Sequence, residues 1–200
     1  MSETRAFRRR PALLIALLAL GASVLSGCGD DESGSSSGDT KFVRGTGKIT
    51  EVKSGERQKA PDISGKGVDG KRLELSDYKG KIVVLNVWGS WCAPCRAEAP
   101  NLAKVAQETE DKGVQFVGIN TRDLDRANAK AFERNYGVGY PSFFDPSGKL
   151  VLRFPKGTLS PQAIPSTLIL DRDGKIAVRA LKELSEKELR SVLDPLTAEK

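Results

Sequence analysis

The chain has 200 residues, enough for one domain with additional terminal segments. Its 32 Lys and Arg against 26 Asp and Glu include four arginines within the first ten residues, so the rest of the surface is mixed and no nucleic-acid partner is expected. The chain has no histidine, which excludes Ser-His-Asp and Cys-His hydrolases and removes the commonest metal ligand.

The first segment, residues 1–27, has the layout of a secretory signal. Arginines at residues 5–10 precede an apolar core at residues 12–20, which is too short to span a bilayer comfortably. The segment ends in Leu-Ser-Gly followed by Cys28, which resembles the bacterial lipobox and implies a lipoprotein signal peptide with lipidation of Cys28. An ordinary secreted chain and an uncleaved anchor remain alternatives, and the arginine run leaves twin-arginine export open.

Residues 28–40 are predicted to form a lipid-anchored flexible linker. From residue 29 to residue 40 there is no large apolar side chain, so this segment cannot bury a core. The folded domain, residues 41–200, is therefore expected outside the cytoplasm, anchored by lipid to the outer face of the bacterial cell membrane. With Cys28 lipidated, two cysteines remain for redox chemistry.

The folded part begins with alternating strand and helix patterns. Residues 71–75 alternate as a short strand after an Asp-Gly turn. Residues 82–88 are an apolar run without periodicity, typical of a strand buried on both faces. A helix is predicted over residues 93–112, a strand over 114–120 and a second helix over 125–136.

The remainder of the chain predicts extended pieces, a hairpin and a closing helix. Residues 142–154 are extended around an Asp-Pro-Ser-Gly turn, and strands at 166–170 and 175–179 flank an Asp-Gly turn. A helix over residues 185–193 begins at a capping box on Ser185. The order predicts an α/β fold, with a central mixed β-sheet flanked by helices on both faces.

The two remaining cysteines lie in Trp-Cys-Ala-Pro-Cys, residues 91–95. Cys92 falls where strand 82–88 gives way to a helix, and the positive end of a helix favours a thiolate. Pro94 fits the first helical turn, where its missing N–H costs nothing. This geometry makes Cys92 the exposed, attacking sulfur and Cys95 the sulfur that releases a mixed disulfide.

Residues 83–102 read Val-Val-Leu-Asn-Val-Trp-Gly-Ser-Trp-Cys-Ala-Pro-Cys-Arg-Ala-Glu-Ala-Pro-Asn-Leu. This stretch resembles the TlpA/ResA-like branch of the thioredoxin superfamily, whose members are membrane-tethered thiol–disulfide oxidoreductases. The resemblance extends in looser form over residues 58–193. It implies a thioredoxin-like fold with an extra N-terminal strand and an insertion before the β-hairpin.

The resemblance also implies a cis-proline that faces the cysteines. The Ile164-Pro165 pair fits in position, and a cis bond there would expose the Ile164 backbone to a bound client chain. A trans loop proline is the alternative. Trp91 would shield one side of the site's mouth, whereas Trp88 is expected in the core.

Glu98 follows Cys95 by one helical turn, and in ResA-like relatives a glutamate at this position influences the protonation of the cysteines. Carried over, Glu98 would disfavour a thiolate by like charge and exchange a proton; a solvated helix glutamate is the alternative. The buried aspartate of cytosolic thioredoxin has no obvious counterpart. Asn86 is the only polar residue in its strand and cannot titrate.

The family resemblance favours a protein-disulfide reductase. Its expected partners are a disulfide-containing protein client, for example apocytochrome c before haem attachment, and a membrane electron donor that reduces it again. The Ala-Pro pair between the cysteines lacks the basic residue typical of strongly oxidising relatives. A thiol oxidase that forms disulfides and a non-catalytic peptide-binding lipoprotein remain alternatives.

No cofactor and no metal site are expected. One cysteine pair without histidine does not supply the four ligands of a zinc site. The motifs of a copper chaperone and of a thiol peroxidase are also missing. A purely structural Cys92–Cys95 bond is disfavoured because so short a loop gives little entropic stabilisation.

Overall fold

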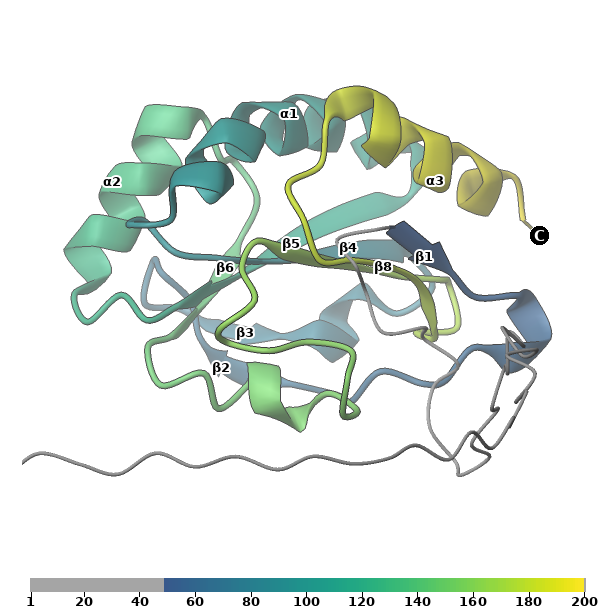
Figure 1. The fold of residues 1–200 in the computed structure, drawn as a ribbon, viewed down its shortest axis with the longest axis horizontal. Coiled ribbons are helices and arrows are strands. Elements are labelled where there is room, and N and C mark those ends of the chain that lie inside the picture. Colours follow the sequence, from purple (N-terminus) through teal and green to yellow (C-terminus); the bar gives the residue numbers. More distant parts are fainter. Residues whose placement is uncertain (1–48, 200) are drawn as a thin grey trace, which may run out of the picture. The chain divides into compact units, whose positions relative to one another are not determined.

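The computed structural model describes residues 49–199, which contain a six-stranded mixed sheet in the order β1-β8-β7-β4-β5-β6 (Figure 1). Its strands are β1 (Ile49–Glu51), β4 (Ile82–Trp88), β5 (Val114–Thr121), β6 (Ser142–Asp145), β7 (Ser166–Leu170) and β8 (Ile176–Ala180). A separate two-stranded sheet pairs β2 (Ser64–Lys66) with β3 (Arg72–Glu74). The α-helices are α1 (Ala93–Thr109), α2 (Arg126–Tyr136) and α3 (Glu186–Ala198).

Strand β4 lies at the centre of the sheet, parallel to β5 and antiparallel to β7. All seven of its residues are buried, as the apolar run predicts. The hairpin of β7 and β8 is confirmed. Strand β1 extends the sheet at the free edge of β8 and is the extra N-terminal strand. The thioredoxin-like α/β fold with a central mixed sheet is therefore confirmed.

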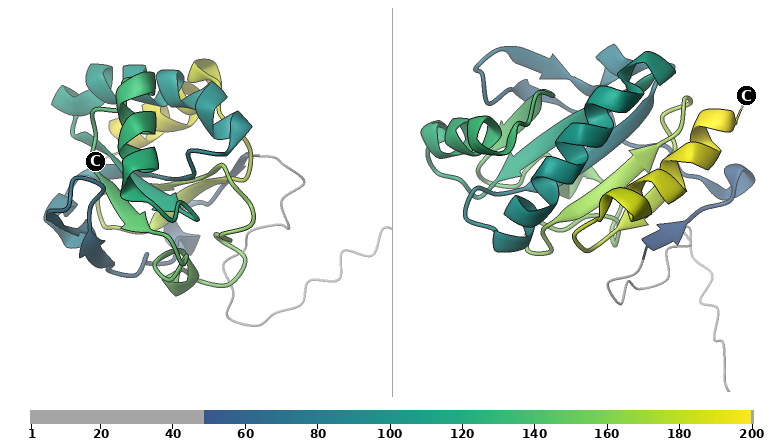
Figure 2. Two further views of the ribbon diagram at one scale, coloured as in Figure 1. Left: turned by 90° about the vertical axis from the view of Figure 1, so that its left-hand side faces the viewer. Right: turned by 90° about the horizontal axis from the view of Figure 1, so that it is seen from above.

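All three α-helices pack on one face of the main sheet, as the view from above shows (Figure 2). The prediction that helices cover both faces of the sheet is therefore wrong. The chain runs β4-α1-β5-α2-β6 through adjacent parallel strands, and right-handed crossovers that advance in one direction place both helices on the same side. The opposite face is covered by the β2–β3 sheet and by residues 146–165, with Leu73, Val151 and Phe154 in that core.

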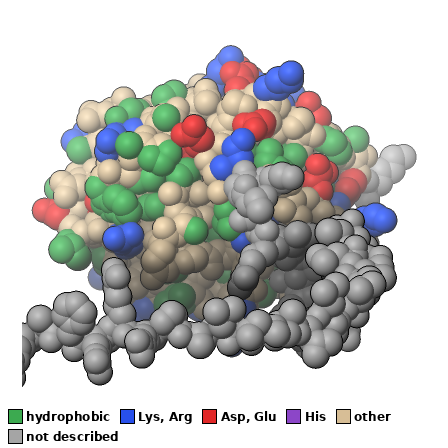
Figure 3. Space-filling view, viewed as in Figure 1, with side chains coloured by type: hydrophobic (Ala, Val, Ile, Leu, Met, Phe, Trp, Pro, Cys, Tyr) green, Lys and Arg blue, Asp and Glu red, His purple; other side chains and the backbone are tan. Residues whose placement is uncertain are grey.

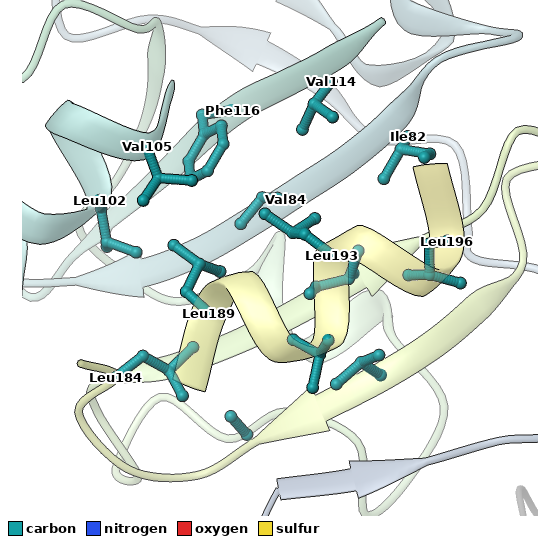
Figure 4. Packing of buried hydrophobic residues seen from close by; sticks show 14 of the residues in the cluster. Ile82, Val84, Leu102, Val105, Val114, Phe116, Leu184, Leu189, Leu193 and Leu196 are labelled. Carbon is teal, nitrogen blue, oxygen red and sulfur yellow. The ribbon is translucent and has the colours of Figure 1, made fainter. Parts of the chain in front are cut away.

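The core beneath the helices joins α1 and α3 to the sheet (Figure 4). Leu189 and Leu193 of α3 point toward Val84 of β4 and are at most 1% exposed. Burying one such side chain fully contributes about 1.5–3 kcal/mol, so this packing fixes α3 on the sheet. The predicted capping box at the start of α3 is present, because Ser185 Oγ accepts from the backbone amide of Glu188 at 3.3 Å.

The extended prediction for residues 142–154 holds only for β6. The Asp145 carboxylate accepts hydrogen bonds from the backbone amides of residues 149–151, at 2.9, 2.8 and 3.3 Å. These bonds turn the chain back on itself, and Val151–Arg153 forms a 3-10 helix instead of a strand. Together with β6, this segment lies in the predicted insertion before the hairpin.

The predicted signal peptide, the linker and Cys28 lie outside the described residues. Within residues 49–199 no helix is both long and apolar enough to cross a lipid bilayer. On the face of the molecule in Figure 3, acidic and basic side chains are interspersed with apolar ones rather than separated by sign.

Candidate active site

Cys92 and Cys95 form a disulfide at the N-terminus of α1. Cys92 is the N-cap residue, and its Sγ accepts a hydrogen bond from the Cys95 backbone amide at 3.2 Å. Pro94 lies in the first turn, as predicted. Cys92 is only 4% exposed and Cys95 1%, so in this disulfide form the expected exposed sulfur is largely buried. The pair packs in an apolar cluster that includes Trp88, and Ile164 contacts the same cluster.

Glu98 lies on the same buried face of α1 as Cys95, one turn further along, and is 2% exposed. Its Oε1 accepts a hydrogen bond from Asn86 Nδ2 at 2.8 Å, and its Oε2 accepts one from the Leu184 backbone amide at 2.9 Å. Asn86 Nδ2 also donates to Thr167 Oγ1 at 3.1 Å. Glu98 is therefore not a solvated helix residue, because Asn86 of β4 and the Leu184 backbone before α3 each hold one oxygen of its carboxyl group in the interior.

Burial raises the pKa of Glu98 from its ordinary value of 4.5 to about 7. The hydrogen bonds from Leu184 and Asn86 oppose this rise because they favour the charged carboxylate. A carboxyl group with a pKa near neutrality can hold or release a proton under ordinary conditions. The arrangement thus places a carboxyl group with a raised pKa one helical turn beyond Cys95, with Asn86 as a hydrogen-bond donor to it rather than as a titrating group.

A second buried carboxylate, Asp123, was not recognised from the sequence. It lies just after β5 and is 3% exposed. It accepts hydrogen bonds from the Ser90 backbone amide at 2.9 Å, from Ser90 Oγ at 2.5 Å and from Asn120 Nδ2 at 2.6 Å. These bonds attach the loop before Cys92 to the end of the neighbouring strand. The available signal was an Asn and an Asp at the carboxyl end of a strand parallel to β4, where ligand-binding residues gather in α/β sheets.

The structure also places the remaining predicted residues, Pro165, Trp88 and Trp91. The Ile164–Pro165 peptide bond is cis, as expected, and Pro165 directly precedes β7, whose first residue pairs with Val87 of β4. Trp88 is in the core and stacks on Phe132 with ring centroids 4.2 Å apart. Trp91 is 46% exposed, which is consistent with a position at the mouth of the site.

The described residues, 49–199, do not meet the requirements of a metal site. Within that range no group of three or more Cys, Asp, Glu or His side chains is placed to hold a metal ion. What the arrangement offers is a cysteine pair that forms a disulfide at a helix N-terminus, a buried carboxyl group whose pKa is raised to about 7, and a cis-proline directly before β7.

Comparison with known proteins agrees with this chemistry. Residues 57–179 match the AhpC/TSA family. Thiol-disulfide oxidoreductase ResA from Bacillus thuringiensis is 31% identical over 140 residues, which cover 70% of this chain and 78% of that protein. The thioredoxin-like protein YneN from Bacillus subtilis is 34% identical over 145 residues, covering 72% and 82%.

Solved structures also resemble the fold. A DsbF homologue from Corynebacterium diphtheriae is 37% identical with a TM-score of 0.72, and the match covers 80% of this chain and all of that one. A secreted thiol-disulfide isomerase from Corynebacterium glutamicum is 34% identical with a TM-score of 0.73, covering 79% and 97%. On these matches, which span most of the folded part, the chain belongs to the AhpC/TSA family and, within the thioredoxin superfamily, to the TlpA/ResA-like thiol–disulfide oxidoreductases.

Proposed function

We propose that the protein is an extracytoplasmic, membrane-tethered protein-disulfide reductase. The observation on which this rests is the Cys92–Cys95 couple at a helix N-terminus, one turn from a buried carboxyl group. The clients would be folded or unfolded proteins with accessible disulfides, for example apocytochrome c before haem attachment. An extracytoplasmic location is supported by the similarity to a secreted thiol-disulfide isomerase.

The reaction would proceed by two thiol–disulfide exchanges. The Cys92 thiolate attacks one sulfur of a client disulfide, forms a mixed disulfide and releases a client thiolate. The Cys95 thiolate then attacks the Cys92 sulfur, which restores the Cys92–Cys95 disulfide and releases the second client thiolate. The client gains two electrons and the protein loses two. The thiolates require loss of protons, and Glu98 would accept the proton of Cys95 while the client thiolates take up protons.

After each cycle the Cys92–Cys95 disulfide must be reduced again, which requires an external source of electrons. A membrane dithiol donor would reduce the Cys92–Cys95 disulfide by the same exchange chemistry in the opposite direction. Pro165 and the Ile164 backbone would hold the client chain beside Cys92 during the first exchange. Trp91 would cover one side of the same contact.

The direction of electron flow follows from how well the reduced form is stabilised. A low pKa of the attacking thiol stabilises the reduced form of the cysteine couple, and this makes the protein a stronger oxidant. Here Ala93 and Pro94 provide no cation between the cysteines, and a charged Glu98 would disfavour a nearby thiolate by like-charge repulsion. Both features weaken the stabilisation of the reduced form, and they favour a reductant.

The reduction potential of the Cys92–Cys95 couple tests this direction. Equilibration of the protein with dithiothreitol or glutathione buffers should give a potential near or below about −250 mV, close to that of thioredoxin. A potential near about −120 mV, as in strongly oxidising periplasmic enzymes, would reverse the proposed direction. The similarity to a protein described as an isomerase is the observation that favours this second function, in which the protein forms or rearranges disulfides.

We also propose that Cys28 is the lipidated N-terminus of the mature protein, on the evidence of the Leu-Ser-Gly-Cys sequence after the apolar core. Replacing Cys28 with alanine should move the protein from the membrane fraction of a bacterial host to the soluble extracytoplasmic fraction. The matched control is Ser26→Ala, which keeps a small residue before the cysteine and should stay in the membrane fraction. If the Cys28→Ala protein remained membrane-bound, an uncleaved anchor would replace the lipid.

A further inference from the structure

Arg122, at the carboxyl end of β5, has an unusual backbone conformation. Its φ angle is 61°, and it is the one non-glycine residue with a positive φ between residues 49 and 199. A left-handed conformation is unfavourable for a side chain of this kind and persists only where the surroundings impose it. Here the next residue, Asp123, is held by the three hydrogen bonds from Ser90 and Asn120. The fold therefore imposes the position of Arg122.

The result of this conformation is a cation stacked on the tryptophan that precedes Cys92. The guanidinium carbon of Arg122 lies 4.6 Å from the centroid of the Trp91 ring. Trp91 is 46% exposed, and Leu124 in the same loop is 91% exposed. Of the three exposed large hydrophobic side chains within residues 49–199, Trp91 contacts Arg122 and Leu124 follows Arg122 by two positions. These three residues, Arg122, Trp91 and Leu124, are called the docking platform below.

The charge on the docking platform is available to a partner. Within residues 49–199 no carboxylate lies within ion-pair distance of Arg122. The two carboxylates in its own loop have other roles, because Asp123 accepts from Ser90 and Asn120, and Asp125 Oδ1 accepts from the Ala127 backbone amide at 2.8 Å. Arg122 is exposed, and a guanidinium carries planar N–H donors that can form two parallel bonds to a carboxylate.

We propose that the docking platform binds an extended client segment that carries an Asp or Glu side chain close to its reactive cysteine. Arg122 pairs with that carboxylate, while Trp91 and Leu124 contact an apolar side chain of the same segment. Because Trp91 adjoins Cys92 and an extended chain advances about 3.3 Å per residue, the acidic residue lies within about three residues of the client cysteine. This inference rests on the proposed reductase function and adds a substrate preference to it.

The test compares two disulfide peptides that differ only in Asp or Asn beside the attacked cysteine. The protein is the full-length chain with Cys28→Ala and Cys95→Ser, in which Cys92 is the sole remaining cysteine and the mixed disulfide accumulates. The measured quantity is the ratio of the two rates of mixed-disulfide formation. We expect the Asp peptide to react about three- to tenfold faster at low ionic strength, with the ratio falling toward one at high salt.

Arg122→Asn should reduce that ratio to one, and asparagine tolerates the left-handed backbone, so the loop is retained. Arg122→Lys should leave an intermediate ratio because lysine keeps the charge but not the paired N–H edge. Arg134→Asn, at an exposed arginine on α2, is the matched control and should keep the full ratio. The ratio is insensitive to a general change in Cys92 reactivity, which affects both peptides equally.

The docking inference would be overturned if the two peptides reacted at equal rates with the unmodified platform. It would also be overturned if Arg122→Asn left the ratio unchanged. Either result would leave the proposed reductase function intact. A variant that slows both peptides to the same extent would also overturn the docking inference, because Arg122 would then act only on the loop. Failure of Cys92 to form a mixed disulfide with either peptide would overturn the proposed function itself.

Discussion

Replacing Cys95 with serine should make the protein accumulate a stable mixed disulfide with its client, whereas replacing Cys92 should prevent any covalent complex. Cys92 caps α1, and Cys95 lies inside the first turn with its amide donating to Cys92 Sγ, so only Cys95 is placed to release a chain bound to Cys92. Both variants should lose catalytic disulfide reduction by about 10³-fold or more. The measurement is non-reducing electrophoresis of the full-length chain with a disulfide-containing client, beside a turnover assay.

The Cys28→Ala background removes the third cysteine and is the matched control, since it should retain turnover. A complex trapped by the Cys92 variant and not by the Cys95 variant would exchange the two assigned roles. If the variant lacking both Cys92 and Cys95 retained full biological activity, the non-catalytic peptide-binding alternative would replace the enzyme. Comparing the unfolding of that variant with the oxidised parent would show how much the short disulfide stabilises the fold, which we expect to be little.

The sequence predicted the strands of the main sheet well and their surroundings poorly. The unbroken apolar run of β4 correctly indicated burial on both faces, because each face of such a strand must be covered by another layer of the fold. It carried no information about whether helix or sheet supplies the cover. That choice depends on β6 joining the sheet beyond β5, which places α2 on the same side as α1, and such an edge pairing is not visible in local composition.

The site shows the same division between local and long-range information. The cysteine pair, Pro94 and the Glu98 position follow from short spacings along one helix. Asn86 was correctly described as unable to titrate, yet its hydrogen bond to Glu98 is one of the contacts that hold the carboxyl group in place. The Ser90–Asp123 bonds join positions 33 residues apart, and only the parallel pairing of β4 with β5 brings them together.

Glu98→Gln should change the pH dependence of stability. The folded protein raises the pKa of Glu98 from 4.5 to about 7, so between these values the folded state binds a proton that the unfolded state has lost. Stability therefore falls as pH rises through this window, by about 2–3 kcal/mol between pH 5 and pH 8 for this group. Glutamine does not titrate, but its amide group faces one of the two N–H donors, which costs about 1–2 kcal/mol at every pH.

The expected result is a variant that is similar to or slightly less stable than the parent at pH 5 and as stable or more stable at pH 8. Urea unfolding of both oxidised proteins at several pH values measures the difference. Glu110→Gln, at an exposed residue just beyond α1, is the matched control and should give a difference independent of pH over this range. A parent and a Glu98→Gln variant whose stabilities fell in parallel from pH 5 to pH 8 would show that Glu98 does not take up the proton. The proton of Cys95 would then need another acceptor, because Asn86, Thr167 and the Leu184 amide around Glu98 do not titrate in this range.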